Sequence, residues 1–152
     1  MPEGTIGTIS PNSPENYVRL VKRLFFDGFS GGHLEVVEEV FSPDTEFNAP
    51  GAPPGIEGIK AMVKKNNSAM SDWQFHIDDM ISDGDKTAVR WHATGNHTGS
   101  FMGEEPTGKA VILNGLVIYQ IENNRIVRNW LMGDNLGFLN QLGLVALPKA
   151  DA

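Results

Sequence analysis

The sequence predicts an α+β domain in which helices cover one face of a curved antiparallel sheet. Apolar residues recur at helical spacing up to about residue 70 and then alternate along strands that turn residues separate. A short helical pattern returns after Asp134. Helices followed by a run of strands are typical of layered α+β folds. Such a sheet can close over its helices and leave a pocket lined by inward side chains.

Three helices are predicted in the first half of the chain. Residues 13–15 (Ser-Pro-Glu) provide a capping hydroxyl, a proline at the first helical position and an early acid, and glycines from Gly28 onward should stop this helix. A second, short helix should end at residues 43–44 (Pro-Asp), and a third should cover residues 57–70. Residues 45–49 between them are a brief strand candidate.

The strands are predicted from alternation and turn chemistry. Residues 73–77 have period two, and an Asp-Gly turn in residues 82–85 leads into a strand over residues 87–95. Residues 110–121 are nearly all apolar, so this strand should lie in the middle of the sheet, buried on both faces. Two asparagines in residues 122–125 should turn the chain into a last strand.

Length and composition predict one domain with a proper core. The chain has 152 residues, 40% of them apolar, with a folded core over roughly residues 14–143 and peripheral tails at residues 1–12 and 144–152. Twelve basic against nineteen acidic residues leave a formal charge of −7, which disfavours nucleic acid and anionic membranes as partners. The absence of cysteine excludes disulfides, thiolate metal sites and cysteine nucleophiles.

The sequence also suggests a compartment. The first residues lack a basic segment followed by an apolar run, so no signal peptide is visible. No apolar stretch approaches the ~20 residues that span a bilayer. A soluble cytoplasmic protein is the simplest expectation.

Asp134 is the strongest functional candidate. It follows the apolar residues 130–132, so its carboxylate should lie where water is scarce. Such a carboxylate can cap the helix that begins at Asn135, or it can act as an acid/base in a pocket. The two roles are compatible, and the residues alone leave both open.

Three segments together resemble a known family. Residues 53–63, 85–111 and 124–143 match, in order and spacing, the SnoaL-like polyketide (ester) cyclases of the nuclear transport factor 2-like superfamily. The most specific motifs are F-x-G-x-x-P-T-G-K at residues 101–109 and Trp-x-x-x-Asp at residues 130–134. The resemblance extends over roughly residues 14–143.

The resemblance implies a cone-shaped α+β barrel with a deep, mostly apolar cavity, usually in a homodimer or higher homo-oligomer. In characterised cyclases, an Asp at the Trp-x-x-x-Asp position acts as acid/base in an intramolecular aldol closure of a polyketide ester. Asp134 matches that position. These enzymes use neither a metal nor an organic cofactor, so the resemblance implies no cofactor and a small apolar or polyketide-like ligand.

The chain departs from the family pattern on its central strand. The cyclases place a His and a Gln there, whereas this strand contains no His and offers Asn114, Tyr119 and Gln120. Asn48 matches, within a residue or two, an Asn that the family keeps near the first strand, and Asn129 precedes the tryptophan where many relatives have His.

We therefore expect six substrate-binding residues around Asp134: Asn48, Trp91, His92, Asn114, Gln120 and Trp130. Asn114 is either a pocket donor or part of a structural network, since a buried amide must be hydrogen-bonded. A simple two-residue turn before Arg125 would put Tyr119 on one face with Arg128 and Trp130, and Gln120 on the other. A bulge would change this parity.

Three functions are compatible with the sequence. The first is a cofactor-independent enzyme that acts on a small apolar carbonyl compound, with Asp134 as acid/base. The second is a ligand-binding protein that keeps the cavity without the full catalytic set. The third is another reaction in the same cavity, such as isomerisation or epoxide hydrolysis, which rests on analogy of fold alone.

Overall fold

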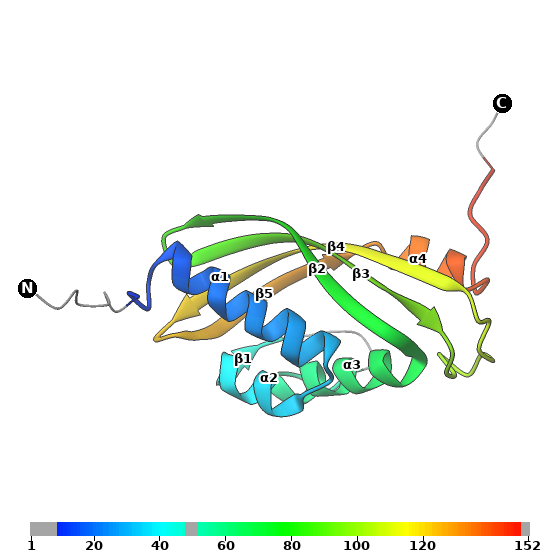
Figure 1. Cartoon of the computed structure of the whole chain (residues 1–152), viewed down its shortest axis with the longest axis horizontal. Helices are drawn as coiled ribbons and strands as arrows, with labels where there is room; N and C mark the ends of the chain where they lie inside the picture. Colours follow the sequence, from blue (N-terminus) through cyan, green and yellow to red (C-terminus); the bar gives the residue numbers. More distant parts are fainter. Residues whose placement is uncertain (1–8, 48–51, 150–152) are drawn as a thin grey trace, which may run out of the picture.

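A computed structural model describes residues 9–47 and 52–149. Five strands form one sheet in the order β1-β5-β4-β3-β2, and the sheet arches over a layer of helices (Figure 1). The elements in chain order are α1 (Pro14–Lys22), η1 (Arg23–Ser30), α2 (Leu34–Val40), β1 (Phe41–Glu46), α3 (Ile56–Ala69), β2 (Met70–Asp83), β3 (Lys86–His97), β4 (Ala110–Glu122), β5 (Arg125–Gly133) and α4 (Asn135–Gln141). The predicted fold class and order of elements are confirmed.

The first helix begins as predicted but changes its winding. The Ser13 hydroxyl accepts the backbone N–H of Asn16 at 3.2 Å, so the cap is present. The α-helix then ends at Lys22, and η1 continues as a wider π-helix through Gly28 to Ser30. The expectation that Gly28 stops the helix is therefore wrong, whereas the helix does end at Gly31. In this last turn the N–H of Gly31 donates to the carbonyl of Phe26, five residues back.

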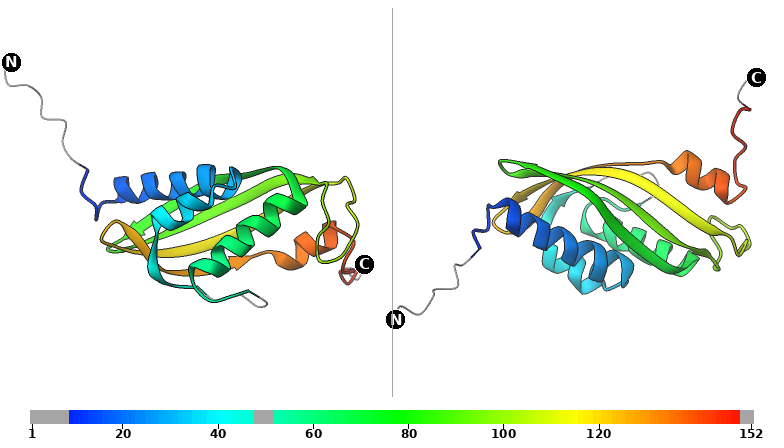
Figure 2. Two further views of the ribbon diagram at one scale, coloured as in Figure 1. Left: turned by 90° about the horizontal axis from the view of Figure 1, so that it is seen from below. Right: turned by 45° about the horizontal axis from the view of Figure 1, so that its top comes forward.

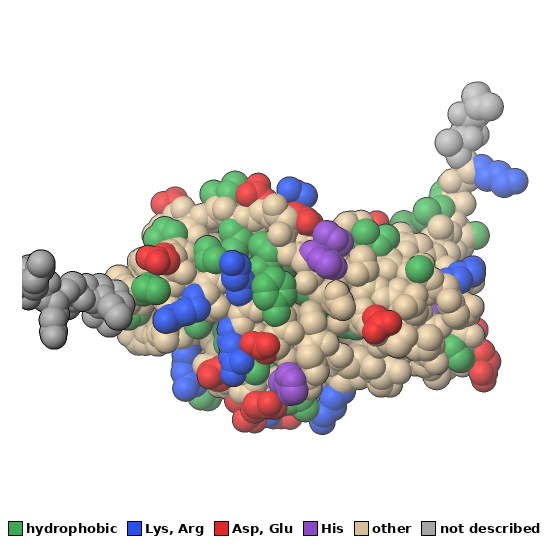
Figure 3. Space-filling view, viewed as in Figure 1, with side chains coloured by type: hydrophobic (Ala, Val, Ile, Leu, Met, Phe, Trp, Pro, Cys, Tyr) green, Lys and Arg blue, Asp and Glu red, His purple; other side chains and the backbone are tan. Residues whose placement is uncertain are grey.

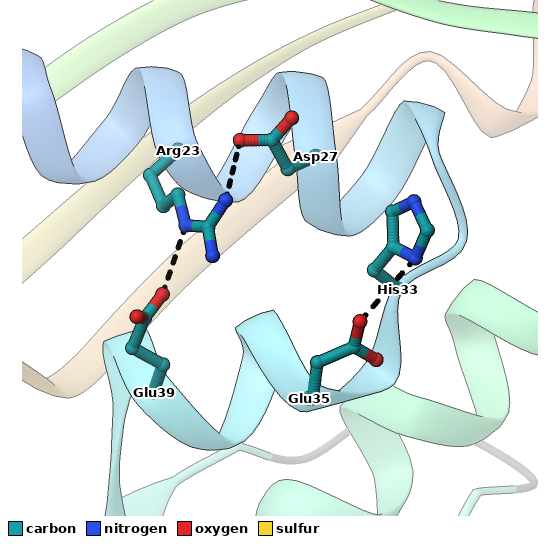
Figure 4. A network of polar contacts seen from close by, with 5 residues as sticks. All are labelled: Arg23, Asp27, His33, Glu35 and Glu39. Atoms are coloured by element: carbon teal, nitrogen blue, oxygen red, sulfur yellow. Dashed lines mark hydrogen bonds and ion pairs between the residues drawn. The ribbon is translucent and has the colours of Figure 1, made fainter.

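Charged side chains join η1 to α2. The Arg23 guanidinium donates to Asp27 at 2.8 Å and to Glu39 at 2.9 Å, and His33 lies 3.3 Å from Glu35 at the start of α2 (Figure 4). Hydrogen bonds to the carboxylates of Glu39 and Asp27 raise the pKa of Arg23 above its usual value. All of these groups are exposed to solvent, so the pairs contribute little to stability.

The first strand differs from its prediction. It was expected over residues 45–49, but β1 runs over Phe41–Glu46 because α2 already ends at Val40. Pro43 therefore lies inside the strand. It is tolerated there because β1 is an edge strand. In the described sheet β1 pairs only with β5, so its other edge has no hydrogen-bonded neighbouring strand.

The hairpins of the sheet follow the predicted turn chemistry. Gly84 has φ +61° in the β2–β3 turn, and Asn123 and Asn124 have φ +50° and +64° in the β4–β5 turn. These left-handed conformations suit Gly and Asn. The sheet order places β4 at the centre, as predicted.

The two faces of the sheet have different environments. All of the helices α1 to α3 lie on the concave side, and α4 lies at one end of the sheet (Figure 2). Side chains on this inner face are buried, whereas the outer face is open. The expectation that β4 is buried on both faces is therefore wrong. The outer face of β4 and β5 exposes Ile112, Leu116, Ile118, Trp130 and Met132.

Charge is distributed evenly over the helical layer. Basic and acidic side chains are interspersed on the face shown in Figure 3, without a continuous basic area. Within residues 9–47 and 52–149, no helix is long and apolar enough to cross a membrane.

Candidate functional site

A small apolar pocket lies between the inner face of the sheet and the helices. Its volume is about 30 Å³. Aromatic and aliphatic side chains form most of its wall, and the lining residues that carry a side-chain polar atom are Trp91, Tyr119 and Asn129. The lining residues come from η1, α3 and all five strands: Phe25, Phe29, Phe41, Ile59, Phe75, Trp91, Val117, Tyr119, Asn129 and Leu131.

Two larger hollows, of about 750 and 610 Å³, are open grooves at the surface. The first runs along β2 beside η1, and the second crosses the ends of β2, β3 and β4 near Gln141. Asp134 lines neither groove nor the inner pocket, whereas Trp91 lines the inner pocket alone. The inner pocket is therefore the better candidate site, although it is far smaller than the ~300–1,000 Å³ of a typical ligand pocket.

A bulge in β5 decides which polar residues reach the pocket. Tyr119 pairs with Asn129, but Ile121 pairs with Ile126, so β5 contains one extra residue, Val127. Tyr119 and Asn129 therefore share the inner face. The parity expected for an unbulged hairpin, with Tyr119 beside Trp130, is wrong.

Burial changes the acid–base behaviour of Tyr119. Its side chain is 4% exposed, and desolvation raises the pKa of its hydroxyl above the ordinary value. The hydroxyl is therefore protonated at neutral pH and can donate a hydrogen bond.

Four of the six expected substrate-binding residues lie on the outer face of the sheet. His92 pairs with Asn114 across β3 and β4, and Gln120 and Trp130 lie on the same side. Because the sheet separates these side chains from the pocket, the expectation that they line it is wrong. Trp91 does line the pocket, and Asn48 lies outside the described residues.

The outer-face residues form contacts of their own. His92 Nδ1 lies 2.9 Å from both carboxylate oxygens of Asp78, and its ring stacks on His76 with centroids 4.5 Å apart. Gln120 donates to Asp85 at 2.7 Å. Within the described ranges, no group of three His, Asp or Glu side chains is arranged to hold a metal ion.

Asp134 lies at the joint between β5 and α4. Its backbone N–H donates to the carbonyl of Asn114 at 2.8 Å, and its Oδ1 accepts the N–H of Gly137 at 3.0 Å. The carboxylate thus caps α4, as one of its two predicted roles requires. It is exposed, however, and Met132 before it is 76% exposed. The expectation of a water-poor environment is wrong, because the apolar run before Asp134 includes the exposed outer face.

Trp91 packs against β4 beside the strand pair that leads to this joint. Trp91 pairs with Gly115 on β4, and Gly115 pairs with Gly133 on β5, the residue before Asp134. The indole lies against Gly115, since a Cβ there would overlap the Trp91 ring, whereas the atoms nearest a Cβ at Gly133 belong to Asn135 and Asn114. Gly115 thus leaves room for the indole that lines the pocket.

The pocket opens beside β5. Leu131 lines it and is nevertheless 39% exposed, so this side chain lies between the interior and the solvent. Leu131 lies near the end of β5, three residues before Asp134. A ligand that enters past Leu131 would therefore pass close to the β5–α4 joint.

The motif at residues 101–109 has a structural role. The backbone N–H of Thr107 donates to Nδ1 of His97 at 3.1 Å, and the N–H of His97 donates to the carbonyl of Lys109 at 2.8 Å. His97 is buried, so these bonds attach the loop to the end of β3.

Sequence reasoning missed the aromatic wall of the pocket. Phe25, Phe29 and Phe75 pack around Trp91 with ring centroids 5.2–6.3 Å apart. The helical spacing of Phe25 and Phe29 indicates a buried face, but it does not show whether that face fills a core or borders a pocket.

Comparison with known structures identifies the same fold. TsrD from Streptomyces laurentii superposes with a TM-score of 0.80 at 23% identity, over 88% of this chain and 98% of that chain. IdmH from Streptomyces antibioticus, a proposed polyketide cyclase, has 29% identity and a TM-score of 0.71 over 83% and 97%. A proposed polyketide cyclase from Acidithiobacillus ferrooxidans has 26% identity and a TM-score of 0.71 over 93% and 100%.

A comparison with curated proteins finds no match. The family model for SnoaL-like polyketide cyclases, by contrast, matches residues 19–142, which is most of the chain. The family expected from the motifs and the nuclear transport factor 2-like fold are thus both confirmed. This chain belongs to the SnoaL-like polyketide cyclase family.

Proposed function

We propose that this protein is a cofactor-independent enzyme of the polyketide cyclase type, which acts on a small, largely apolar carbonyl compound with Asp134 as acid/base. The observation that carries the proposal is that Leu131, which lines the apolar pocket and is 39% exposed, precedes Asp134 by only three residues at the end of β5. We infer that a ligand in the opening at Leu131 also reaches the carboxylate.

The proposed reaction needs one carboxylate and no redox step. Asp134 removes a proton from a carbon next to a carbonyl, and the electron pair of the C–H bond forms an enolate. The enolate carbon attacks a second carbonyl of the same molecule, which forms a C–C bond and an alkoxide. The proton on Asp134 returns to the alkoxide oxygen, so the product is an isomer of the substrate.

The capping geometry is compatible with this role. Oδ1 of Asp134 is held by the N–H of Gly137, and no hydrogen bond from a described residue reaches Oδ2. The cap therefore orients the carboxylate and leaves one oxygen for a proton. A ligand that covers the joint would exclude water and strengthen the interaction of Asp134 with it.

The small volume of the pocket limits how a ligand can bind. About 30 Å³ corresponds to the space of one water molecule or one carbonyl group. We infer that a carbonyl group enters the pocket while the rest of the ligand lies in the opening, where Leu131 must move. His92, Asn114, Gln120 and Trp130 are not part of the proposed site, because they lie on the other face of the sheet.

Hydrogen–deuterium exchange of benzylacetone tests the acid/base step. This compound is a methyl ketone with a phenyl ring, and NMR in deuterated water follows exchange at the carbons beside its carbonyl. We expect the protein to accelerate exchange and Asp134→Asn to reduce it to the uncatalysed rate. Asn caps helices as well as Asp does, so folding and ligand binding should be retained.

The control variant is Asp44→Asn, which removes an exposed carboxylate from β1. It should exchange benzylacetone like the unmodified protein. Full activity in Asp134→Asn would exclude Asp134 as the acid/base and leave the family assignment untouched.

A ligand-binding protein without catalysis is the second candidate. It is favoured by the absence of carboxylate and His side chains among the described residues that line the pocket. In that case benzylacetone would bind, as detected by chemical-shift changes of pocket residues, and its exchange would not be accelerated.

We also propose that the outer face of β4 and β5 pairs with a second copy of this chain. Five large apolar side chains are exposed there on two adjacent strands. A contiguous apolar surface of this kind is typical of protein interfaces. Homo-oligomerisation would remove it from water.

A further inference from the structure

The first part of β4 extends beyond the strand that pairs with it. The last pair between β4 and β5 joins Gly115 to Gly133, whereas β4 begins at Ala110 and pairs with β3 from there. Residues 110–114 thus have no neighbouring strand on the β5 side in the described sheet. Free N–H and C=O groups along a strand edge need other partners, or they attract a foreign strand.

The side-chain amide of Gln141 provides such a partner. Its Oε1 accepts the N–H of Ile112 at 2.8 Å, and its Nε2 donates to the C=O of Ile112 at 2.9 Å. Two residues opposite each other on antiparallel strands exchange the same two bonds. An amide side chain suits this position, because it carries a donor and an acceptor side by side as a peptide group does. We call these two bonds the Gln141 clamp.

Helix α4 is attached to this edge of β4 at both of its ends. At its start, the N–H of Asp134 donates to the C=O of Asn114 at 2.8 Å. At its last residue, Gln141 holds Ile112, so the helix lies beside the first part of β4 (Figure 1). Between these two points Phe138 is buried in the core. Together these contacts fix the position and the direction of α4 relative to the sheet.

A series of hydrogen bonds connects the clamp to the carboxylate of Asp134. Besides Ile112, Nε2 of Gln141 donates to the C=O of Gly137 at 3.3 Å. Gly137 in turn donates its N–H to Oδ1 of Asp134 at 3.0 Å. The clamp on β4 and the cap of α4 thus meet at Gly137, so the release of Gln141 would loosen the turn that holds the carboxylate.

We propose that Gln141 is a positioning residue, which replaces a strand at the edge of β4 and thereby holds α4 in the orientation that presents the Asp134 carboxylate to the ligand. The part of this inference that concerns acid/base chemistry rests on the proposed function. The clamp itself does not. A displacement of about 1 Å at a reacting group can slow a reaction by about a hundredfold, so a residue outside the pocket can control the rate.

Gln141→Met tests the clamp with little change in side-chain length. Methionine is unbranched and flexible like glutamine, but it has no N–H to donate and only a weak acceptor. The matched control is Gln74→Met, the same substitution at an exposed glutamine of β2.

Amide hydrogen exchange, measured by NMR without a ligand, reports on the clamp. We expect the Ile112 N–H to exchange at least about tenfold faster in Gln141→Met, because it loses its acceptor. The Gly137 N–H should also exchange faster, since the clamp supports the cap that protects it. Gln74→Met should leave both rates unchanged. Unchanged exchange of Ile112 in Gln141→Met would overturn the clamp.

Proton exchange of benzylacetone reports on the positioning role. At saturating benzylacetone the rate should fall at least about tenfold in Gln141→Met. The dissociation constant of benzylacetone should stay the same, because Gln141 does not line the pocket. Gln74→Met should change neither quantity.

The outcomes separate this role from the proposed enzyme. A full rate in Gln141→Met beside an inactive Asp134→Asn would overturn the positioning role and leave the proposed function standing. An Asp134→Asn variant as active as the unmodified protein would overturn both, and the exchange of Ile112 would still decide the clamp.

The unmodified protein gives a further measurement if Gln141→Met does not fold. The side-chain amide protons of Gln141 should show a nuclear Overhauser contact with the backbone N–H of Ile112, because the clamp holds the two groups side by side. The absence of this contact would overturn the clamp.

Discussion

The carboxylate of Asp134 occupies the space in which a side chain at Gly137 would begin. Its Oδ1 accepts the Gly137 N–H at 3.0 Å, and a Cβ at Gly137 would overlap the carboxylate. The close cap therefore requires glycine three residues after the aspartate. Gly137 has a positioning role for the carboxylate that we propose as the acid/base.

Gly137→Ala should move this carboxylate. We expect the loss of the cap to cost about 1 kcal/mol, and the higher helix propensity of Ala to recover up to about 1 kcal/mol. Stability in urea should therefore change little, while the benzylacetone exchange rate falls at least about tenfold, which corresponds to about 1.4 kcal/mol. Asn140→Ala, an exposed change in the same helix, is the control. Retained exchange activity in Gly137→Ala would contradict the positioning role.

Gly115 and Gly133 provide a test of the packing of Trp91 against the sheet. A Cβ at Gly115 would overlap the indole, whereas the nearest atom to a Cβ at Gly133 is 3.4 Å away, an ordinary contact. We expect Gly115→Ala to lower the free energy of unfolding by about 1–3 kcal/mol through overpacking. Gly133→Ala should change it by less than about 1 kcal/mol. Equal effects in urea unfolding would show that the indole does not depend on Gly115.

The raised pKa of Tyr119 predicts a loss of stability at high pH. The unfolded chain releases the phenolic proton near pH 10, and the folded chain retains it because its pKa is raised by desolvation. Above pH 10 the folded state binds more protons than the unfolded state, so stability falls as pH rises, by up to about 1.4 kcal/mol per pH unit. Below pH 10 this contribution is complete and constant.

Tyr119→Phe removes this effect and provides the comparison. Its unfolding free energy should fall less steeply between pH 10 and pH 11 than that of the unmodified protein, as measured by urea titrations at each pH. Parallel slopes for the two proteins would show that Tyr119 titrates alike in the folded and unfolded states.

The proposed pairing of two copies can be tested on the outer face. Leu116→Lys places a charge in the centre of the exposed apolar surface of β4 and β5. We expect it to convert the oligomer to a monomer in light scattering after gel filtration, because burying an unpaired charge is costly. Phe26→Lys changes an exposed apolar residue of the helical layer and should leave the oligomer intact. A monomeric unmodified protein would exclude the pairing.

Local signals in the sequence were sufficient for much of the fold. The cap at Ser13 and the turns at Gly84 and at Asn123–Asn124 depend on a few neighbouring residues, and the structure contains them as predicted. The length and apolarity of β4 place it in the centre of the sheet. The family motifs likewise identify the family, because they are short, ordered and widely separated.

The identity of the pocket residues depends on contacts that no local pattern contains. On β4, Val117 and Tyr119 face inward while Leu116 and Ile118 face outward, so both faces are apolar and alternation cannot tell them apart. The extra residue Val127 then changes which side chains of β5 face inward: Asn129 shares the face of Tyr119, where an unbulged hairpin would place Trp130.

Local patterns and motifs were enough to predict the family, the order of elements and the place of Asp134 directly after β5. The exposed capping position of Asp134 and the place of Tyr119 at the pocket could be seen only in the folded chain. The reason is physical: strand register and sheet curvature assign side chains to a face, and both are set by pairing between segments distant in the sequence.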